Sequence, residues 1–119
     1  MIDNLNVEKL KIYGFGSFFR GAKIFNDIDF LIIHETFSKF SCQAAIKCKY
    51  LIFNELKNSD ISILSIKEEN SLNFIVKSNA IFLGEVSTFD MKKDLAYILD
   101  NKVLNKTISD TAVQIRFSF

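Results

Sequence analysis

Residues 11–33, KIYGFGSFFRGAKIFNDIDFLII, contain the feature that decides the fold. An apolar strand pattern runs into Gly16-Ser17, and a second apolar strand pattern follows that carries Asp27 and Asp29. Residues two apart on a strand project from the same face, roughly 6–7 Å apart. Two carboxylates so close repel each other, and each raises the pKa of the other unless a cation lies between them. The pair therefore predicts a cation site.

Hard oxygen ligands suit Mg²⁺, which takes one or two carboxylates and completes its shell with water and phosphate oxygens. Gly16 allows a phosphate to approach the backbone, and amides at a helix N-terminus point toward negative charge. The Ser17 hydroxyl can donate a further hydrogen bond. Together with Asp27 and Asp29, these residues predict half of a metal site that is completed by a nucleotide.

The composition fits one domain over residues 1–119, with 49% hydrophobic and 24% charged residues. The net charge of +1 gives no argument for a nucleic acid or a membrane surface as a partner. No apolar run reaches the ~18 residues of a membrane helix. The first residues, MIDNLNVEKLK, lack the basic and apolar regions of a signal peptide. We therefore expect a cytoplasmic protein.

The patterns along the chain predict alternating strands and helices. Strands are expected at 9–15, 27–33, 60–66 and 80–86, and helices at 37–57, within 68–79 and at 91–101, with one helical turn capped by Ser17. A capping box over Ser87–Asp90 is expected to start the last helix, and the tail TAVQIRFSF alternates like a strand. This order favours an α/β or α+β domain around one sheet.

The helix over 37–57 carries one apolar stripe, which is expected to be buried: Phe37, Phe40, Ala44, Cys48, Leu51, Ile52 and Leu56. The opposite side is expected to be a solvated face that carries Lys39, Gln43, Lys47, Tyr50, Asn54 and Lys57. In the helix within 68–79, the residues expected to point inward are Leu72, Ile75 and Val76.

Several residues have simpler structural interpretations. Cys42 and Cys48 lie six apart on a helix and point to different sides, so both are expected to be buried, reduced thiols. The only histidine, His34, is expected in a loop, and Glu68 and Glu69 in the first turn of a helix.

The proposed site residues also have simpler alternatives. Asp27 and Asp29 fit a solvated sheet edge, Asp60 fits a turn or cap, and Arg20 fits a surface charge equally well.

The constellation resembles the minimal nucleotidyltransferase family, relatives of the DNA polymerase beta palm. That signature is an apolar residue, Gly-Ser, a spacer of about ten residues and Asp-apolar-Asp-apolar, with Arg-Gly often following the Gly-Ser pair and a third carboxylate opening a later strand. The matching residues here are Phe15, Gly16, Ser17, Arg20, Gly21, Asp27, Ile28, Asp29, Phe30 and Asp60. The resemblance covers roughly residues 7–86, leaving 87–119 as a short helix and a strand-like tail.

The resemblance implies a polymerase-beta-like fold, a mixed sheet of four or more strands flanked by helices. It also implies that two Mg²⁺ ions, bound by Asp27, Asp29 and Asp60, support transfer of a nucleotide. Asp60 would help to deprotonate the acceptor hydroxyl. Gly16, Ser17 and Arg20 would bind the triphosphate, most simply of ATP.

Since only residues 87–119 follow the palm-like part, a second copy or a partner protein is expected to complete the site. Many stand-alone relatives are encoded beside a HEPN ribonuclease and act as its antitoxin by transferring AMP to a tyrosine of the toxin. The resemblance therefore implies an adenylyltransferase antitoxin. One alternative is a catalytically inactive protein that binds a partner, with the strand-like tail adding to a sheet. Another is transfer of a nucleotide to an antibiotic or other small molecule.

Overall fold

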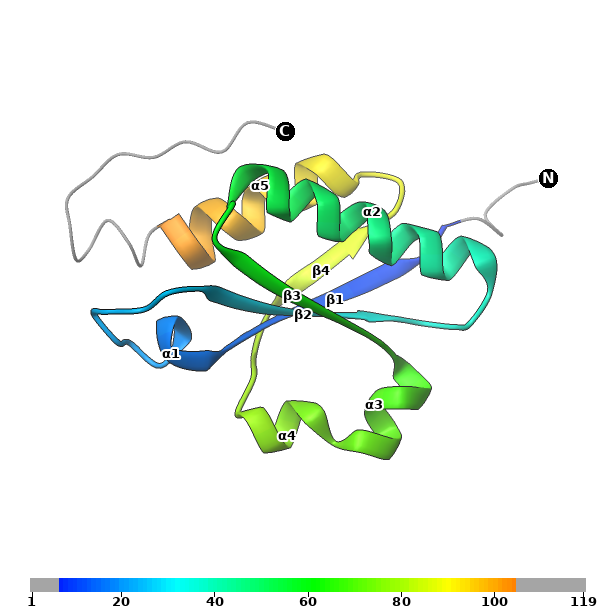
Figure 1. The fold of residues 1–119 in the computed structure, drawn as a ribbon. Coiled ribbons are helices and arrows are strands. Elements are labelled where there is room, and N and C mark those ends of the chain that lie inside the picture. The colour runs from blue at the N-terminus through cyan, green and yellow to red at the C-terminus, as the bar shows by residue number, and fades with distance from the viewer. Residues whose placement is uncertain (1–6, 105–119) are drawn as a thin grey trace.

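The computed structural model describes residues 7–104. Its centre is a four-stranded sheet in the order β3-β2-β1-β4 (Figure 1). The strands are β1 (Lys9–Phe15), β2 (Ile28–His34), β3 (Ser59–Ser65) and β4 (Ile81–Ser87). β1 is antiparallel to both β2 and β4, whereas β2 and β3 are parallel. The expected α+β architecture with a mixed sheet flanked by helices is confirmed, and it is compatible with a nucleotidyltransferase-like fold.

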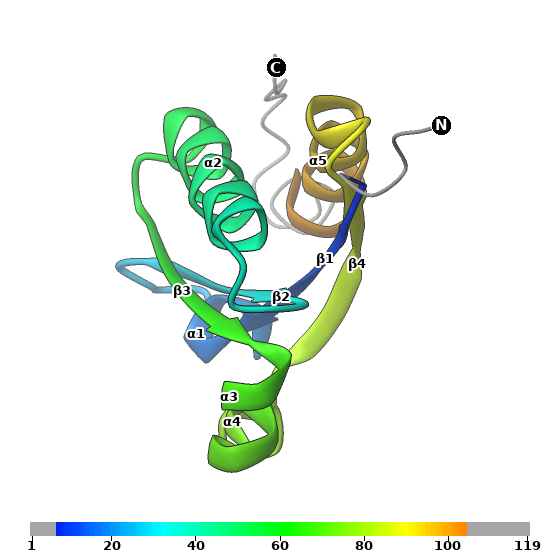
Figure 2. The same cartoon turned by 90° about the vertical axis from the view of Figure 1, so that its right-hand side faces the viewer.

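The helices lie on both sides of the sheet, as Figure 2 shows. They are α1 (Gly16–Phe19), α2 (Lys39–Glu55), α3 (Ile66–Leu72), α4 (Phe74–Ser78) and α5 (Met91–Leu99), which continues into the π-helical turn η2 (Asp100–Leu104). α2 and α5 cover one face, while α3 and α4 lie on the other side of the sheet. Within residues 7–104, no helix combines the length and apolar character needed to cross a membrane.

The main core lies between the sheet and the pair α2 and α5. Alternate residues of β2, namely Ile28, Phe30 and Ile32, belong to this core, as the two-residue period of a strand requires. Leu31 and Ile33 are also buried, although they project from the opposite face. Both faces of β2 are therefore covered along most of its length, which explains its continuous apolar sequence.

α2 begins later than its apolar pattern predicts. Ser38 is the N-cap residue, and its side chain accepts a hydrogen bond from the Ser41 N–H. Phe37 therefore lies before the helix and is exposed, and Phe40 is also exposed, so the prediction that both belong to the buried stripe is wrong. Cys48 is buried and Cys42 partly buried, and both are free thiols as expected.

The segment 68–79 forms parts of two short helices instead of one. Asn73 ends α3 in the left-handed conformation, with φ of 52°, and the chain turns there into α4. As a result Leu72 and Val76 are exposed, and the prediction that they point inward is wrong. Glu68 and Glu69 do lie in the first turn of α3, where Glu68 completes a capping box with Ser65.

The two caps predicted from sequence, at Ser17 and at Ser87–Asp90, are both wrong. Phe15 occupies the N-cap position of α1, without a side-chain cap from Ser17. At α5, Asp90 occupies the N-cap position, also without a side-chain hydrogen bond. The Ser87 N–H donates to the Asp94 carboxylate, which replaces the expected capping box. The strand-like tail, 111–119, lies outside the described residues.

His34 is the last residue of β2 and is buried, so its expected place in a loop is wrong. Its Nδ1 lies 2.9 Å from the Ser41 hydroxyl, which donates to the Glu8 carboxylate and accepts from the Thr36 N–H. Since the hydroxyl gives its one proton to Glu8, His34 must supply the N–H at Nδ1. The network ties the starts of β1 and α2 to the end of β2.

Candidate metal and nucleotide site

The predicted site residues meet at one edge of the sheet. β1 ends at this edge while β2 and β3 begin there, because β1 is antiparallel to β2 and β2 is parallel to β3. Asp29 of β2 is the register partner of both Phe15 in β1 and Asp60 in β3. Gly16 follows Phe15 directly. Residues separated by ten to forty positions in sequence are thus neighbours in the sheet.

The carboxylates face away from α2 and α5. Ile28 and Phe30, the neighbours of Asp29 in β2, point into the main core, so Asp29 projects from the opposite face. Its register partner Asp60 projects from that same face. Asp27 lies just before β2, rather than within it as predicted, and its side chain is exposed, as is that of Asp60. Asp29 is partly buried between them.

The electrostatics of Asp29 depend on all of these neighbours. Burial has the largest effect and raises the pKa of its carboxyl above the usual value of 3.8. The negative charges of Asp60 and then Asp27 raise this pKa further, and the Arg20 guanidinium opposes them by lowering it. Asp29 is thus less exposed than Asp27 and Asp60, whose exposure agrees with the alternative of a solvated sheet edge.

Gly16 is the residue that allows Asp29 to occupy this position. A Cβ atom on Gly16 would overlap the Oδ2 atom of Asp29. Gly16 also has φ of +79°, a conformation that L side chains rarely adopt. The glycine is thus required twice, by the backbone turn and by the carboxylate that lies against it.

α1 is fixed to the sheet by the two phenylalanines that follow Ser17. The Phe18 ring contacts Phe25, and the Phe19 ring contacts Phe30, with ring centroids 4.8 and 5.8 Å apart. Gly14 makes room for Phe19, because a Cβ there would overlap its ring. This packing holds the turn over the end of β1, and it explains why two large apolar residues follow the Gly-Ser pair.

Ser17 and Arg20 occupy the two ends of this turn. Ser17 is partly buried, and its carbonyl accepts hydrogen bonds from the N–H groups of Arg20 and Ala22. Arg20 is exposed and ends α1. Its positive charge lies close enough to Asp29 to lower the pKa of that carboxyl.

Two aromatic rings lie beside the carboxylates, and no sequence pattern predicts their contact. Phe15 lies next to Asp29 on the same face, and its ring contacts Phe74 of α4 edge to face, with centroids 5.1 Å apart. Phe74 reaches this position because α3 and α4 return the chain to the start of β4. These rings place apolar surface beside Asp29, which is consistent with the effect of burial on its pKa.

The donor set suits a hard divalent cation in its chemistry, since all three acids offer carboxylate oxygens. Among residues 7–104, however, no three acidic, histidine or cysteine side chains are arranged to hold a metal ion together. Mg²⁺ needs only one or two protein carboxylates when water and substrate phosphates complete its shell. The carboxylates therefore offer suitable oxygen ligands but, among the described residues, no complete set of ligands for a metal ion.

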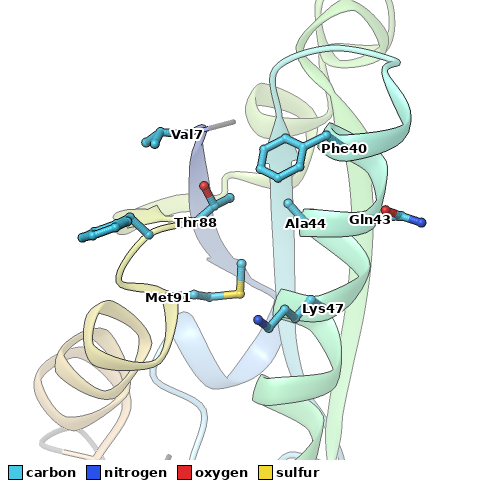
Figure 3. Close-up of a pocket in the computed structure, with 8 residues that line it drawn as sticks. Val7, Phe40, Gln43, Ala44, Lys47, Thr88 and Met91 are labelled. Carbon is cyan, nitrogen blue, oxygen red and sulfur yellow. The ribbon is translucent and has the colours of Figure 1, made fainter. Parts of the chain in front are cut away.

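A pocket of about 280 Å³ lies away from these residues, between α2 and the turn from β4 to α5. It is lined by Val7, Phe40, Gln43, Ala44, Lys47, Thr88, Phe89 and Met91 (Figure 3). None of the predicted site residues takes part in it, so it is a separate feature of the surface.

Comparison of the chain with protein-family models, with curated proteins and with solved structures finds no match.

Proposed function

We propose that the chain is a Mg²⁺-dependent nucleotidyltransferase that transfers a nucleoside monophosphate, AMP from ATP, to a hydroxyl group. The observation that carries this proposal is that the partly buried Asp29 lies beside the exposed Asp27 and Asp60 where β2 and β3 begin. Burial and then the negative charges of Asp60 and Asp27 raise the pKa of Asp29, and a cation beside the three carboxylates would relieve their repulsion. The glycine turn and Arg20 add groups suited to phosphate.

Each residue has a defined task in this proposal. Asp27 and Asp29 would hold the metal ion, which when bound neutralises the triphosphate and stabilises the charge that develops during transfer. Asp60 is exposed at the sheet edge, where its carboxylate accepts the proton of the acceptor hydroxyl. The Ser17 hydroxyl and Arg20 bind phosphate oxygens, and pyrophosphate leaves opposite the attacking oxygen. Most of the rate enhancement would come from positioning and charge neutralisation.

The acceptor proposed is a tyrosine of a partner protein of the HEPN toxin type, which the chain would neutralise as an antitoxin. The exposure of Asp27, Asp60 and Arg20 supports a large acceptor, since a second protein can reach all three side chains. A second copy of the chain is the other macromolecule that can complete the site.

The experiment is a transfer assay with the four α-labelled nucleoside triphosphates and Mg²⁺, with and without the product of the neighbouring gene. Label on the partner that disappears in Asp27→Ala/Asp29→Ala is the expected result. Asp60→Asn should also abolish transfer, whereas Asp90→Asn serves as the matched control, because Asp90 is exposed at the start of α5 and makes no cap hydrogen bond. Folded protein that labels nothing with any nucleotide, yet forms a stable complex with the partner, would replace this proposal with the non-catalytic alternative.

A further inference from the structure

The outer ridge of α2 carries large apolar side chains where a solvated helix carries polar ones. Ile46, Tyr50 and Phe53 are 47%, 62% and 41% exposed. Their spacing of four and then three residues aligns them along one ridge of the helix. At about 100° per residue, this ridge lies opposite the side that buries Cys48 and Ile52. α2 therefore has a buried apolar side and a second apolar stripe that points outward.

Lysines surround this outer ridge. Lys47 and Lys49 flank it on its two sides, and Lys39 and Lys57 lie toward its two ends, all of them exposed. The Lys57 ammonium lies 4.9 Å from the centroid of the Phe53 ring. A central apolar strip with a charged rim is the arrangement of a protein interface.

The pocket of about 280 Å³ adjoins the ridge through Lys47. In Figure 3 the Lys47 side chain reaches across the gap toward Met91, while Gln43 points away from it. Phe40 and the strongly exposed Phe89 belong to the apolar lining. The ridge and the pocket together form one surface, in which Lys47 supplies a positive charge beside a cavity suited to an apolar anchor.

We propose that this surface binds an amphipathic helix of a partner protein whose apolar seam is flanked by Asp and Glu. The apolar ridge of α2 is only one side chain wide, which matches the seam between two packed helices. The surrounding lysines favour a partner with acidic residues. A second α2 would bring lysines against lysines and is disfavoured for that reason. A membrane surface suits a broad apolar face rather than a single ridge.

This surface lies on the face of the sheet that α2 and α5 cover, whereas Asp29 projects from the opposite face. A partner bound here would leave the carboxylates accessible. The inference therefore stands whether or not the chain transfers nucleotides.

The test uses the full chain and two labelled synthetic helical peptides that share leucines at positions i, i+4 and i+7. One peptide has glutamates beside the leucines and the other has lysines. Fluorescence anisotropy at low salt is expected to show binding of the acidic peptide only. Tyr50→Ser should weaken this binding about tenfold, as should Lys47→Glu/Lys49→Glu. Tyr97→Ser on α5 is the matched control, since Tyr97 is 67% exposed, and it should change binding less than about twofold.

Two outcomes would overturn the proposal. The first is that the wild type and the variants, all shown by circular dichroism to be folded, bind the two peptides equally or bind neither of them. The second is that the wild-type chain sediments with phosphatidylglycerol vesicles, that Tyr50→Ser abolishes this sedimentation, and that the acidic peptide does not compete with the vesicles for the chain. Should Tyr50→Ser fail to fold, the charge-reversal pair alone decides, because both lysines are exposed and their replacement leaves the core unchanged.

Discussion

Asp29 and Asp60 are register partners on neighbouring parallel strands, so their carboxylates project from the same face of the sheet. Two acids in such positions repel each other at neutral pH, and Asp27 adds to the repulsion. Folding therefore holds together charges that the unfolded chain keeps apart. Such a cost is typical of a binding site, where it is relieved by the ligand.

Asp29→Asn is expected to stabilise the free protein at pH 7. Because the folded state raises the pKa of Asp29 above 3.8, the folded state binds this proton more tightly than the unfolded state. The contribution of Asp29 to stability is then greatest below pH 3.8 and is lost as the pH rises through the raised pKa. The gain should be only about 0.5 kcal/mol, since water screens a partly exposed carboxylate. Urea unfolding at pH 7 and at pH 3.5 measures it, and a destabilised variant at pH 7 would contradict the repulsion.

Gly16→Ala is expected to destabilise the protein more than Gly21→Ala does. Both glycines have positive φ, +79° and +89°, so both substitutions carry a conformational cost of about 1 kcal/mol. Only at Gly16 does the new Cβ meet another residue, Asp29, whereas nothing lies within 4 Å of a Cβ on Gly21. The extra cost at Gly16 should be about 1–3 kcal/mol. Urea unfolding measures both substitutions.

The coupling between Gly16 and Asp29 can be measured directly. Combining Gly16→Ala with Asp29→Ala should recover part of the lost stability, because the carboxylate that meets the new Cβ is gone. Additive effects of the two substitutions would show that Gly16 does not depend on Asp29.

Ser41→Ala is expected to lower the free energy of unfolding by about 2–3 kcal/mol without changing transfer activity. The substitution removes the one hydroxyl that joins Glu8, His34 and the Thr36 N–H, all in a buried network. Ser38→Ala, which removes the N-cap of α2 and an exposed hydrogen bond donated by the Thr36 hydroxyl, should cost about 1 kcal/mol. Equal costs for the two serines would mean that the buried network contributes nothing beyond a cap.

Cys48 is expected to resist alkylation in the folded protein. Burial raises the pKa of its thiol to about 12, so almost no thiolate forms at pH 8. Cys42 is only partly buried. Iodoacetamide followed by mass spectrometry should show one modified cysteine in the folded chain and two in urea. Modification of Cys48 at the rate of Cys42 would indicate that α2 opens readily.

The sequence alone placed all four strands within two residues, because their apolar patterns are bounded by Gly, Asp, Asn and Ser. Asp60 was expected beside Asp27 and Asp29 only from the family resemblance. The parallel pairing of β2 and β3, which makes Asp29 and Asp60 register partners, gives the physical reason. The contact between Gly16 and Asp29 could not be predicted from the sequence, because it depends on the register between two strands, which no local pattern contains.

Periodicity failed where an apolar residue lies outside the main core. Phe37 and Phe40 fit the apolar stripe of the helix over 37–57 but are exposed, whereas Tyr50 is exposed as predicted for the solvated side. The apolar pattern does not show that Tyr50 shares this outer side with Ile46 and Phe53. Leu72 and Val76 looked internal because the left-handed turn at Asn73, which breaks the helix, has no strong signature in sequence. His34 was expected after the strand because it ends the apolar run, and its buried partner Ser41, seven residues away, has no signature in a local pattern.

The measurement that tests the central claim most directly is paramagnetic broadening by Mn²⁺, which binds the same oxygen ligands as Mg²⁺. Amide signals of Gly16, Asp29 and Asp60 should broaden first in the wild-type chain, in the presence of a non-hydrolysable ATP analogue. Those of Ile33 and Ser65, at the other end of β2 and β3, should stay sharp. In Asp29→Asn the selective broadening should be lost. Broadening that appears elsewhere, or that persists in Asp29→Asn, would contradict a metal and nucleotide site at these carboxylates.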